Sequence, residues 1–225
     1  MTEHEIICEA LNAKQCPRCR TPVVVPYICP GCNDWWNGFG LAYPCGPYIH
    51  PGTLIPSIAK NVLRGVVGLE LLDIGGGGGV VGYDLWREQG IQKLSVLDIF
   101  WPKTAPPGFV LGDGLKAVEI FGEESFDITQ SCEVIEHMDK AKGGQLLDVL
   151  CTVARKFVIL TTPNGFLEQD PTLAPGEPWA TNPYQKHVCG WSSEEFIAKG
   201  FSIYMNNFSP NMTFGGSQII AYKKL

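Results

Sequence analysis

Two carboxylates and an imidazole stand close together in the middle of the sequence. Glu133, Glu136 and His137 are spaced so that a helix beginning after Cys132 would carry all three on one face. A second histidine, His187, lies in a long stretch without helix or strand periodicity, which is typical of a binding loop. Carboxylate and imidazole donors together hold divalent cations. The sequence therefore predicts catalytic roles for Glu133, Glu136, His137 and His187, with Mg²⁺ or Mn²⁺ as a candidate ligand of all four.

The alternative is a site of the same residues without a metal. The glutamates and His137 would then close a pocket or orient a substrate, and His137 or His187 would act as the general base. Cys132, next to this group, is interpreted as a small buried residue rather than a nucleophile.

Four cysteines near the N-terminus form two Cys-x-x-Cys turns, each of which can direct two sulfurs at one tetrahedral centre. They are Cys16, Cys19, Cys29 and Cys32. The nine residues between the turns are fewer than in the usual zinc ribbon, so a compact variant with structural Zn²⁺ is predicted. A redox site is the alternative, but it needs one such pair in a thioredoxin-like context, which the sequence lacks.

A run of five glycines, Gly75 to Gly79, follows a predicted buried strand at 68–74. Such a turn lets the backbone approach a nucleotide closely. Carboxylates stand at the ends of three successive predicted strands, at Asp73, Asp98 and Asp113, the last followed by Gly114. No lysine or arginine stands close to them in the sequence to meet a phosphate. This pattern predicts an adenosine ligand that carries positive charge.

The elements that must position these residues alternate between strand and helix patterns, which indicates an α/β fold with a mainly parallel sheet covered on both faces. Further strands are predicted at 94–97, 109–111, 126–129, 157–160, 201–205 and 218–222, and helices at 54–63, from the glycine run to 86, and at 115–121, 144–154 and 193–199. We expect two parts: residues 1–50, with the zinc knuckles and an aromatic connector, and residues 51–225.

Composition agrees with a globular chain. Of 225 residues, 45% are hydrophobic and 18% charged, which excludes a disordered or fibrous protein. No apolar run approaches the roughly 18 residues of a membrane span, and the first residues are acidic where a signal peptide is basic. We therefore expect a soluble, cytoplasmic protein without a membrane partner. The net charge of −6 argues against a broad nucleic-acid-binding face.

At this point the chain resembles the class I S-adenosylmethionine-dependent methyltransferases over about residues 60–225. The resemblance implies a Rossmann-like, seven-stranded, mainly parallel sheet, here with a small N-terminal four-cysteine subdomain that is similar to a zinc ribbon. It also implies S-adenosylmethionine as the cofactor. Asp73, Gly75 and Gly77 would form its loop, Asp98 would hold the ribose, Asp113 with Gly114 would meet the adenine, and Cys132 would border the methyl group.

The Glu-x-x-Glu-His run, the Thr-Thr-Pro-Asn strand end and the histidine before Trp191 resemble two metal-dependent groups within that class. These are the small-RNA 2′-O-methyltransferases and the O-methyltransferases of ubiquinone biosynthesis. The resemblance implies that Glu133, Glu136, His137 and His187 bind the metal. The RNA enzymes carry a second histidine where this chain has Met138. The stretch from Asn182 to Trp191 also looks like uncharacterised methyltransferases of small or saccharide-like substrates.

The leading hypothesis is a methyltransferase acting on a hydroxyl of a small-molecule or saccharide-like acceptor. An RNA 2′-O-methyltransferase is one alternative. A second is an NAD-dependent oxidoreductase, because Gly77, Gly79 and Gly82 also fit the dinucleotide pattern. A third is a non-catalytic zinc adaptor. The sequence does not fix the oligomeric state.

Overall fold

The computed structural model describes residues 51–78, 90–102, 105–173, 181–207 and 217–225, and, before residue 51, the backbone of four two-residue strands. These strands are β1 (Lys14–Gln15), β2 (Pro22–Val23), β3 (Tyr27–Ile28) and β4 (Trp35–Trp36), paired antiparallel as β1 with β2 and β3 with β4. Cys16, Cys19, Cys29 and Cys32 lie outside the described residues, as do Gly79, Gly82 and the helix expected to end at residue 86. The zinc site therefore stays a prediction.

The chain divides into two compact units, Met1–Gly65 with Met205–Gln218, and Val66–Tyr204 with Ile219–Leu225. In the first unit, helix α2 (Pro51–Val62) confirms the helix predicted at 54–63. Its residues Ile55, Ile58 and Ala59 are buried at helical spacing. The second unit contains the candidate site. The predicted division of the chain at residues 50 and 51 is untested and stays a prediction.

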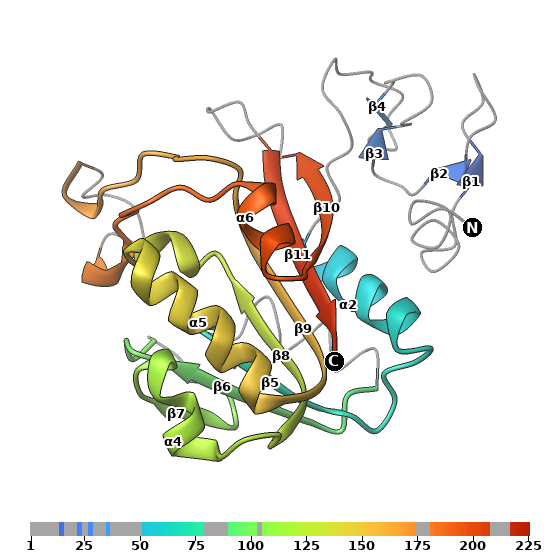
Figure 1. The fold of residues 1–225 in the computed structure, drawn as a ribbon, viewed down its shortest axis with the longest axis horizontal. Coiled ribbons are helices and arrows are strands. Elements are labelled where there is room, and N and C mark those ends of the chain that lie inside the picture. Colours follow the sequence, from blue (N-terminus) through green and yellow to red (C-terminus); the bar gives the residue numbers. More distant parts are fainter. Residues whose placement is uncertain are drawn as a thin grey trace. The chain divides into compact units, whose positions relative to one another are not determined.

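Seven strands form one sheet in the order β10-β11-β9-β8-β5-β6-β7 (Figure 1). Their bounds are β5 (Glu70–Ile74), β6 (Lys93–Asp98), β7 (Phe109–Leu111), β8 (Phe126–Cys132), β9 (Ala154–Pro163), β10 (Ser202–Asn207) and β11 (Ser217–Lys224). The pairs β5–β6, β6–β7, β5–β8 and β8–β9 are parallel. The chain moves outward from β5 to β7 and then returns to β8. The carboxyl ends of β5 and β8 therefore form a switch point, where open α/β sheets bind their ligands.

All seven predicted strands are confirmed, and the differences lie at their ends. The first begins at Glu70, because Gly68 has φ of +76° and belongs to a turn. Helix α5 (Lys140–Val153) begins before the predicted residue 144, because the Asp139 carboxylate caps it by accepting the Lys142 N–H at 2.9 Å. The helix predicted at 115–121 consists of a 3₁₀ turn, η1 (Gly114–Lys116), and α4 (Ala117–Phe121). Helix α6 spans Ser193–Ala198.

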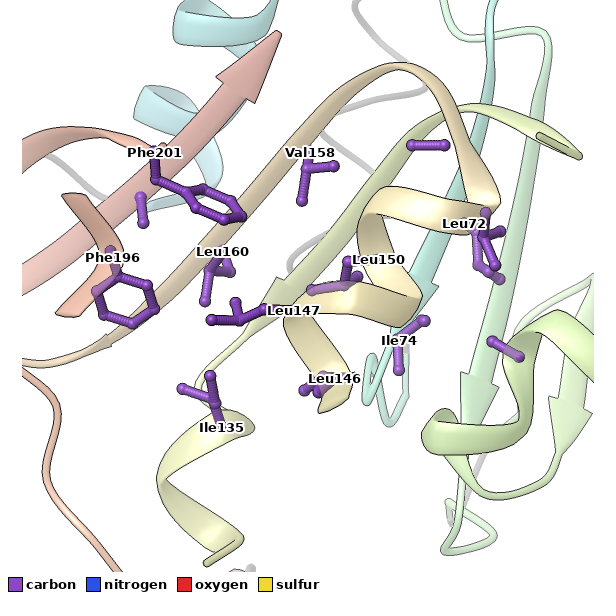
Figure 2. Close-up of a cluster of buried hydrophobic side chains, with 14 of the residues drawn as sticks. Leu72, Ile74, Ile135, Leu146, Leu147, Leu150, Val158, Leu160, Phe196 and Phe201 are labelled. Carbon is purple, nitrogen blue, oxygen red and sulfur yellow. The ribbon is translucent and has the colours of Figure 1, made fainter. Parts of the chain in front are cut away.

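Helix α5 covers the centre of the sheet with one apolar face. Its residues Gly143, Leu146, Leu147, Leu150 and Val153 are buried at helical spacing. Figure 2 shows the leucines of this face directed toward strand side chains, which include Leu72, Ile74, Val158 and Leu160. Burial of this cluster holds the carboxyl ends of β5, β8 and β9 together beside the start of α5.

Among the described residues, no helix is long and apolar enough to cross a membrane.

At the opposite end of the sheet, Asp127 joins three strands. Its carboxylate accepts the Glu70 N–H at 3.0 Å and the Arg155 Nε–H at 3.2 Å, and it lies 2.9 Å from Lys156 Nζ. Burial alone would raise the pKa of Asp127, but hydrogen bonds from Arg155, Glu70 and Lys156 outweigh it and lower the pKa to about 2. A carboxyl with a depressed pKa stabilises the fold above its ordinary pKa, and this contribution is lost as the pH falls toward 2.

We expect Asp127→Asn to lower the free energy of unfolding by about 2 kcal/mol at pH 7, because the amide loses the charge-assisted hydrogen bonds. The difference from the wild type should shrink as the pH falls from 4 toward 2. Chemical denaturation at several pH values measures both effects. Asp148→Asn is the control, because its pair with Lys199 is exposed, and it should change stability by less than about 0.5 kcal/mol. A pH-independent loss in Asp127→Asn would contradict the assignment.

Candidate functional site

Asp73 is a buried carboxylate at the end of the central strand β5. It is 1% exposed, and neither of its side-chain oxygens has a hydrogen-bond partner among the described residues. Burial, together with the nearby charge of Asp98 and opposed by the Gln130 amide, raises the pKa of Asp73 to about 7. Buried carboxylates are normally paired. An unpaired one beside a glycine turn indicates a place where a cationic or hydrogen-bond-donating ligand would compensate it.

The turn after β5 depends on glycine. Gly75 has φ of +77°, and a Cβ there would come within 2.3 Å of the Val134 side chain. A Cβ on Gly76 would lie 2.7 Å from Asp73 Oδ2. Gly77 has φ of +52°. No side chain fits between this turn and the residues beneath it, so the backbone itself forms the surface of the site.

The next two strands each end in a fixed carboxylate. Asp98, the last residue of β6, accepts the Gly77 and Phe100 N–H groups at 2.8 Å each, which ties the glycine turn to β6. Asp113, after β7, accepts the Leu115 N–H at 3.0 Å and caps η1. Each accepted hydrogen bond uses one lone pair of an oxygen that has two. Both carboxylates can therefore accept hydrogen bonds from a ligand as well.

A cavity of about 410 Å³ opens beside these strand ends. Of the residues predicted from the sequence, it is lined by Gly75, Asp98, Asp113, Gly114, Glu133 and His137. Asp73, Gly77, Cys132, Glu136 and His187 are not among its lining residues. Other lining residues were missed from the sequence and include Ile99, Leu115, Lys142, Asn182, Tyr184 and Val188. Those after residue 180 belong to the stretch that the sequence indicated as a binding loop, but without periodicity the sequence could not indicate which of its side chains line the cavity.

The prediction that a helix begins directly after Cys132 is wrong. Strand β8 continues through Cys132, which pairs with Thr161 of β9. Glu133 has φ of +54°, and its N–H donates to the Thr161 carbonyl at 2.9 Å. A 3₁₀ turn, η2, begins only at Ile135 and ends at His137. Glu133 therefore does not share a helix face with Glu136 and His137. A positive φ in a residue other than glycine is uncommon and is often found at functional sites.

Glu136, His137 and His187 form a cluster in which one ligand atom of each lies within 4.8 Å of the others. Glu133 is not a member of this cluster. Glu136 is 1% exposed; its Oε2 accepts the Thr162 hydroxyl at 2.9 Å, and its Oε1 has no hydrogen-bond partner among the described residues. Burial, with repulsion from Glu133, raises the pKa of Glu136 well above its usual value. A buried carboxylate with one unpartnered oxygen, grouped with two imidazoles, matches the donor set of a divalent metal.

The hydrogen bonds of the two imidazoles determine which ring nitrogen of each has a lone pair for a metal or a proton. His137 Nδ1 contacts the Lys186 carbonyl at 3.1 Å, and His187 Nδ1 contacts the Leu167 carbonyl at 2.6 Å. A carbonyl only accepts, so each Nδ1 carries the proton. Burial lowers the pKa of His137 to about 4 and also lowers the pKa of His187, so both rings are neutral at pH 7. Each Nε2 then has a free lone pair, as a metal ligand or a general base needs.

His187 reaches the cluster on a loop whose two ends meet. Asn164 and Gly165 form β-bridges with Trp191, and the Gly165 N–H donates to the Trp191 carbonyl at 2.7 Å. Within the loop, the N–H groups of Val188 and Cys189 both donate to the Glu136 carbonyl, at 2.8 and 3.2 Å. Glu136 thus holds the segment that carries His187. The structure brings His187 to Glu136 and His137 as the sequence predicted, and the roles of the three residues stay predictions.

Cys132 is partly buried beside this group. Burial, with the nearby charges of Asp73 and Glu133, raises the pKa of its thiol well above the usual value. A protonated thiol is a poor nucleophile. The position therefore agrees with a small packing residue.

Comparison with known proteins adds to this geometry. No protein-family model matches the chain, and no curated protein matches it. Among solved structures, a SAM-dependent methyltransferase from Archaeoglobus fulgidus aligns with 77% of this chain and 94% of its own, at 16% identity and TM-score 0.50. The 1,6-didemethyltoxoflavin-N1-methyltransferase of Burkholderia thailandensis, solved with S-adenosylhomocysteine, aligns over 78% of both chains at 16% identity and TM-score 0.55.

The magnesium protoporphyrin IX methyltransferase of Synechocystis PCC 6803, solved with bound SAH, aligns with 77% of this chain and 82% of its own, at 15% identity and TM-score 0.51. At these identities the likeness is one of fold. The chain has the Rossmann-like fold of S-adenosylmethionine-dependent methyltransferases.

We expect Gly75→Ala to be more destabilising than Gly68→Ala. The two glycines have φ of +77° and +76°, but a Cβ on Gly68 meets nothing within 4 Å, whereas one on Gly75 meets Val134. Gly68→Ala should lower the free energy of unfolding by about 1 kcal/mol through backbone strain alone. Gly75→Ala should lower it by about 2–4 kcal/mol, because overpacking adds to the strain. Urea denaturation measures both, and equal losses would contradict the close approach of the turn to Val134.

Proposed function

We propose that this protein is an S-adenosylmethionine-dependent methyltransferase that methylates a hydroxyl group of a small-molecule or saccharide-like acceptor, assisted by a divalent metal. The observation that carries the proposal is the row of carboxylates at the ends of β5, β6 and β7. Asp98 and Asp113 line one cavity, and Asp73 is buried beside its glycine turn without a partner among the described residues. The fold agrees with this function.

The strand-end carboxylates suit a cationic nucleoside better than a dinucleotide. A sulfonium and an α-ammonium group would compensate the charge of Asp73 and Asp98, while Asp98 and Asp113 keep lone pairs for ribose hydroxyls and an adenine amino group. A pyrophosphate at the same turn would be repelled by the Asp73 carboxylate. The oxidoreductase alternative is therefore less favoured. Titration calorimetry with S-adenosylmethionine and with NAD separates the two cofactors directly.

The donor set of Glu136, His137 and His187 suits a metal that accepts nitrogen ligands. Mg²⁺ prefers oxygen ligands and retains its waters, whereas Mn²⁺ and neighbouring transition metals accept imidazole readily. Three protein ligands leave coordination positions for an acceptor hydroxyl or a vicinal diol. We therefore propose Mn²⁺ rather than Mg²⁺ as the preferred ion.

In the proposed mechanism, the bound cofactor supplies an electrophilic methyl group and the metal supplies Lewis acidity that lowers the pKa of an acceptor hydroxyl. Glu136, His137 and His187 would hold the metal and thereby orient the acceptor. Glu133, which lines the cavity, accepts the acceptor proton at its carboxylate. The methyl group would pass from the cofactor sulfur to the acceptor oxygen, whose proton Glu133 would take. Positioning and exclusion of water by the loop that carries His187 would contribute most of the rate.

The charges around the cavity favour a small acceptor over RNA. Lys140, Lys142 and Lys186 lie on the elements around the site, and each is paired with a carboxylate, of Glu195, Asp139 and Asp170 respectively. RNA binding relies on cations that are available to phosphates. The asparagine, tyrosine and glutamine side chains at residues 182, 184 and 185 line the cavity instead and suit a hydroxylated small molecule.

We expect Asp73→Asn to weaken cofactor binding and to stabilise the free protein. Losing the carboxylate should reduce the affinity for S-adenosylmethionine by more than about tenfold, because its positive charge loses its partner. Because the folded-state pKa of Asp73 is raised above 3.8 to about 7, the wild type loses stability as the pH rises through that range. At pH 8 the free energy of unfolding of the ligand-free variant should be about 1–3 kcal/mol higher than that of the wild type.

Titration calorimetry and chemical denaturation test this pair of effects. Denaturation at pH 4 is the internal control, because the wild-type Asp73 is largely protonated there and the stability difference should nearly vanish. The side chains that interact with Asp73, and so influence its titration, are those of Asp98, Gln130 and Cys132. Unchanged affinity for the cofactor, or a variant that is less stable at pH 8, would contradict the role of Asp73.

We expect Glu136→Gln and His137→Ala to abolish methyl transfer while S-adenosylmethionine binding stays within about threefold of the wild type, because both residues act on the acceptor side. Transfer of labelled methyl to a panel of vicinal diols and saccharides measures activity, with Mn²⁺ and with Mg²⁺. Exposed Glu119, on α4, provides the control variant Glu119→Gln. Wild-type turnover in both site variants would refute the site assignment.

A further inference from the structure

Two consecutive threonines lie just before Pro163, the last residue of strand β9, and each donates a hydrogen bond to one carboxylate of the site. Thr161 and Thr162 are 1% and 0% exposed. The Thr162 hydroxyl donates to Glu136 Oε2 at 2.9 Å, and the Thr161 hydroxyl donates to Glu133 Oε1 at 2.8 Å. Neighbouring residues in a strand point to opposite sides. The two hydroxyls can therefore serve two different carboxylates.

The hydrogen bond from Thr162 gives the two carboxylate oxygens of Glu136 different surroundings. Oε2 accepts the hydroxyl, and Oε1 lies buried without a hydrogen-bond partner among the described residues. Glu136 contributes one carboxylate oxygen to the cluster with His137 and His187. Threonine is branched at Cβ and stiff at χ1, so its hydroxyl is a fixed donor. A glutamate side chain has several rotatable bonds and would otherwise have to be ordered on metal binding. The hydroxyl thus orients the carboxylate before a ligand arrives.

We propose that Thr162 is the positioning residue of the metal site: its hydroxyl holds Glu136 so that Oε1 faces the two histidines as a ligand. The inference rests on the proposed function, of which it specifies one part. Thr161 has a different partner, because Glu133 lies outside the cluster and lines the cavity. The adjacent threonine is therefore a matched control with the same chemistry, strand and burial.

The test is a titration of the protein with Mn²⁺. The electron paramagnetic resonance signal of free Mn²⁺ measures the binding, and the measurement needs no acceptor. Thr162→Val keeps the shape of the side chain and removes the hydroxyl. We expect it to weaken Mn²⁺ binding by about 10–100-fold, the usual effect of losing a group that orients a metal ligand. Thr162→Ser restores the hydroxyl and should stay within about threefold of the wild type.

Thr161→Val should bind Mn²⁺ within about threefold of the wild type, because its partner Glu133 lies outside the cluster of Glu136, His137 and His187. Thr129→Val controls for stability: Thr129 is 0% exposed, and its hydroxyl donates to the Leu150 carbonyl at 2.9 Å, within the core. All variants are compared by chemical denaturation. The free energy of unfolding of Thr162→Val should be no lower than that of Thr129→Val. A loss of Mn²⁺ affinity in Thr162→Val that exceeds the loss in Thr129→Val then reports on the site and not on stability.

The outcomes separate this inference from the function on which it rests. If the wild type binds no Mn²⁺, the metal part of the proposed function fails and the inference fails with it. If the wild type binds Mn²⁺ and Thr162→Val binds it equally well, the inference alone is overturned. Equal losses in Thr161→Val and Thr162→Val also overturn it, because the effect would then not depend on Glu136. A selective loss in Thr162→Val that Thr162→Ser restores supports it.

Discussion

The parallel pairing of β8 with β9 is the constraint on which the candidate site depends. Its register sets Cys132 opposite Thr161, and the Glu133 N–H continues the ladder to the Thr161 carbonyl. That register brings the two threonine hydroxyls to Glu133 and Glu136 just where β8 ends. A slip of one residue would exchange the sides to which the threonines point and separate both hydroxyls from their carboxylates. The core beneath α5, which buries Val158 and Leu160 of β9, therefore also fixes the polar contacts of the site.

Two buried carboxylates in this fold are left incompletely compensated. Both oxygens of Asp73 and one oxygen of Glu136 have no hydrogen-bond partner among the described residues, and burial raises the pKa of each group. Isolated, such groups destabilise a fold, and proteins tolerate them mainly where a ligand completes them. Both lie near Cys132, the last residue of β8, and the charge of each raises the pKa of its thiol. Asp73 would be completed by the proposed cationic cofactor and Glu136 by the proposed metal.

Sequence and structure agree where parallel strands alone decide position. Asp73, Asp98 and Asp113 could be grouped because the carboxyl ends of neighbouring parallel strands meet at one edge, whatever the loops do. The helix after Cys132 could not be excluded in the same way, since i, i+3 and i+4 spacing fits a helix whether or not the chain forms one. The left-handed Glu133 is imposed by the continued pairing with β9, which is a tertiary contact. The roles of Thr161 and Thr162 depend on the same pairing and leave no periodic signal, and the loop residues that line the cavity leave none either.

The meeting of His187 with Glu136 and His137 follows from the backbone rather than from the side chains. The Glu136 carbonyl accepts the N–H groups of Val188 and Cys189, while the His137 ring donates to the Lys186 carbonyl. These hydrogen bonds hold the segment on both sides of His187, and the bridges to Trp191 close the loop behind it. A histidine far along the chain is thus positioned by the very residues with which it would bind a metal. The sequence could therefore suggest that His187 belongs to the site, but the means by which it arrives is a property of the folded backbone.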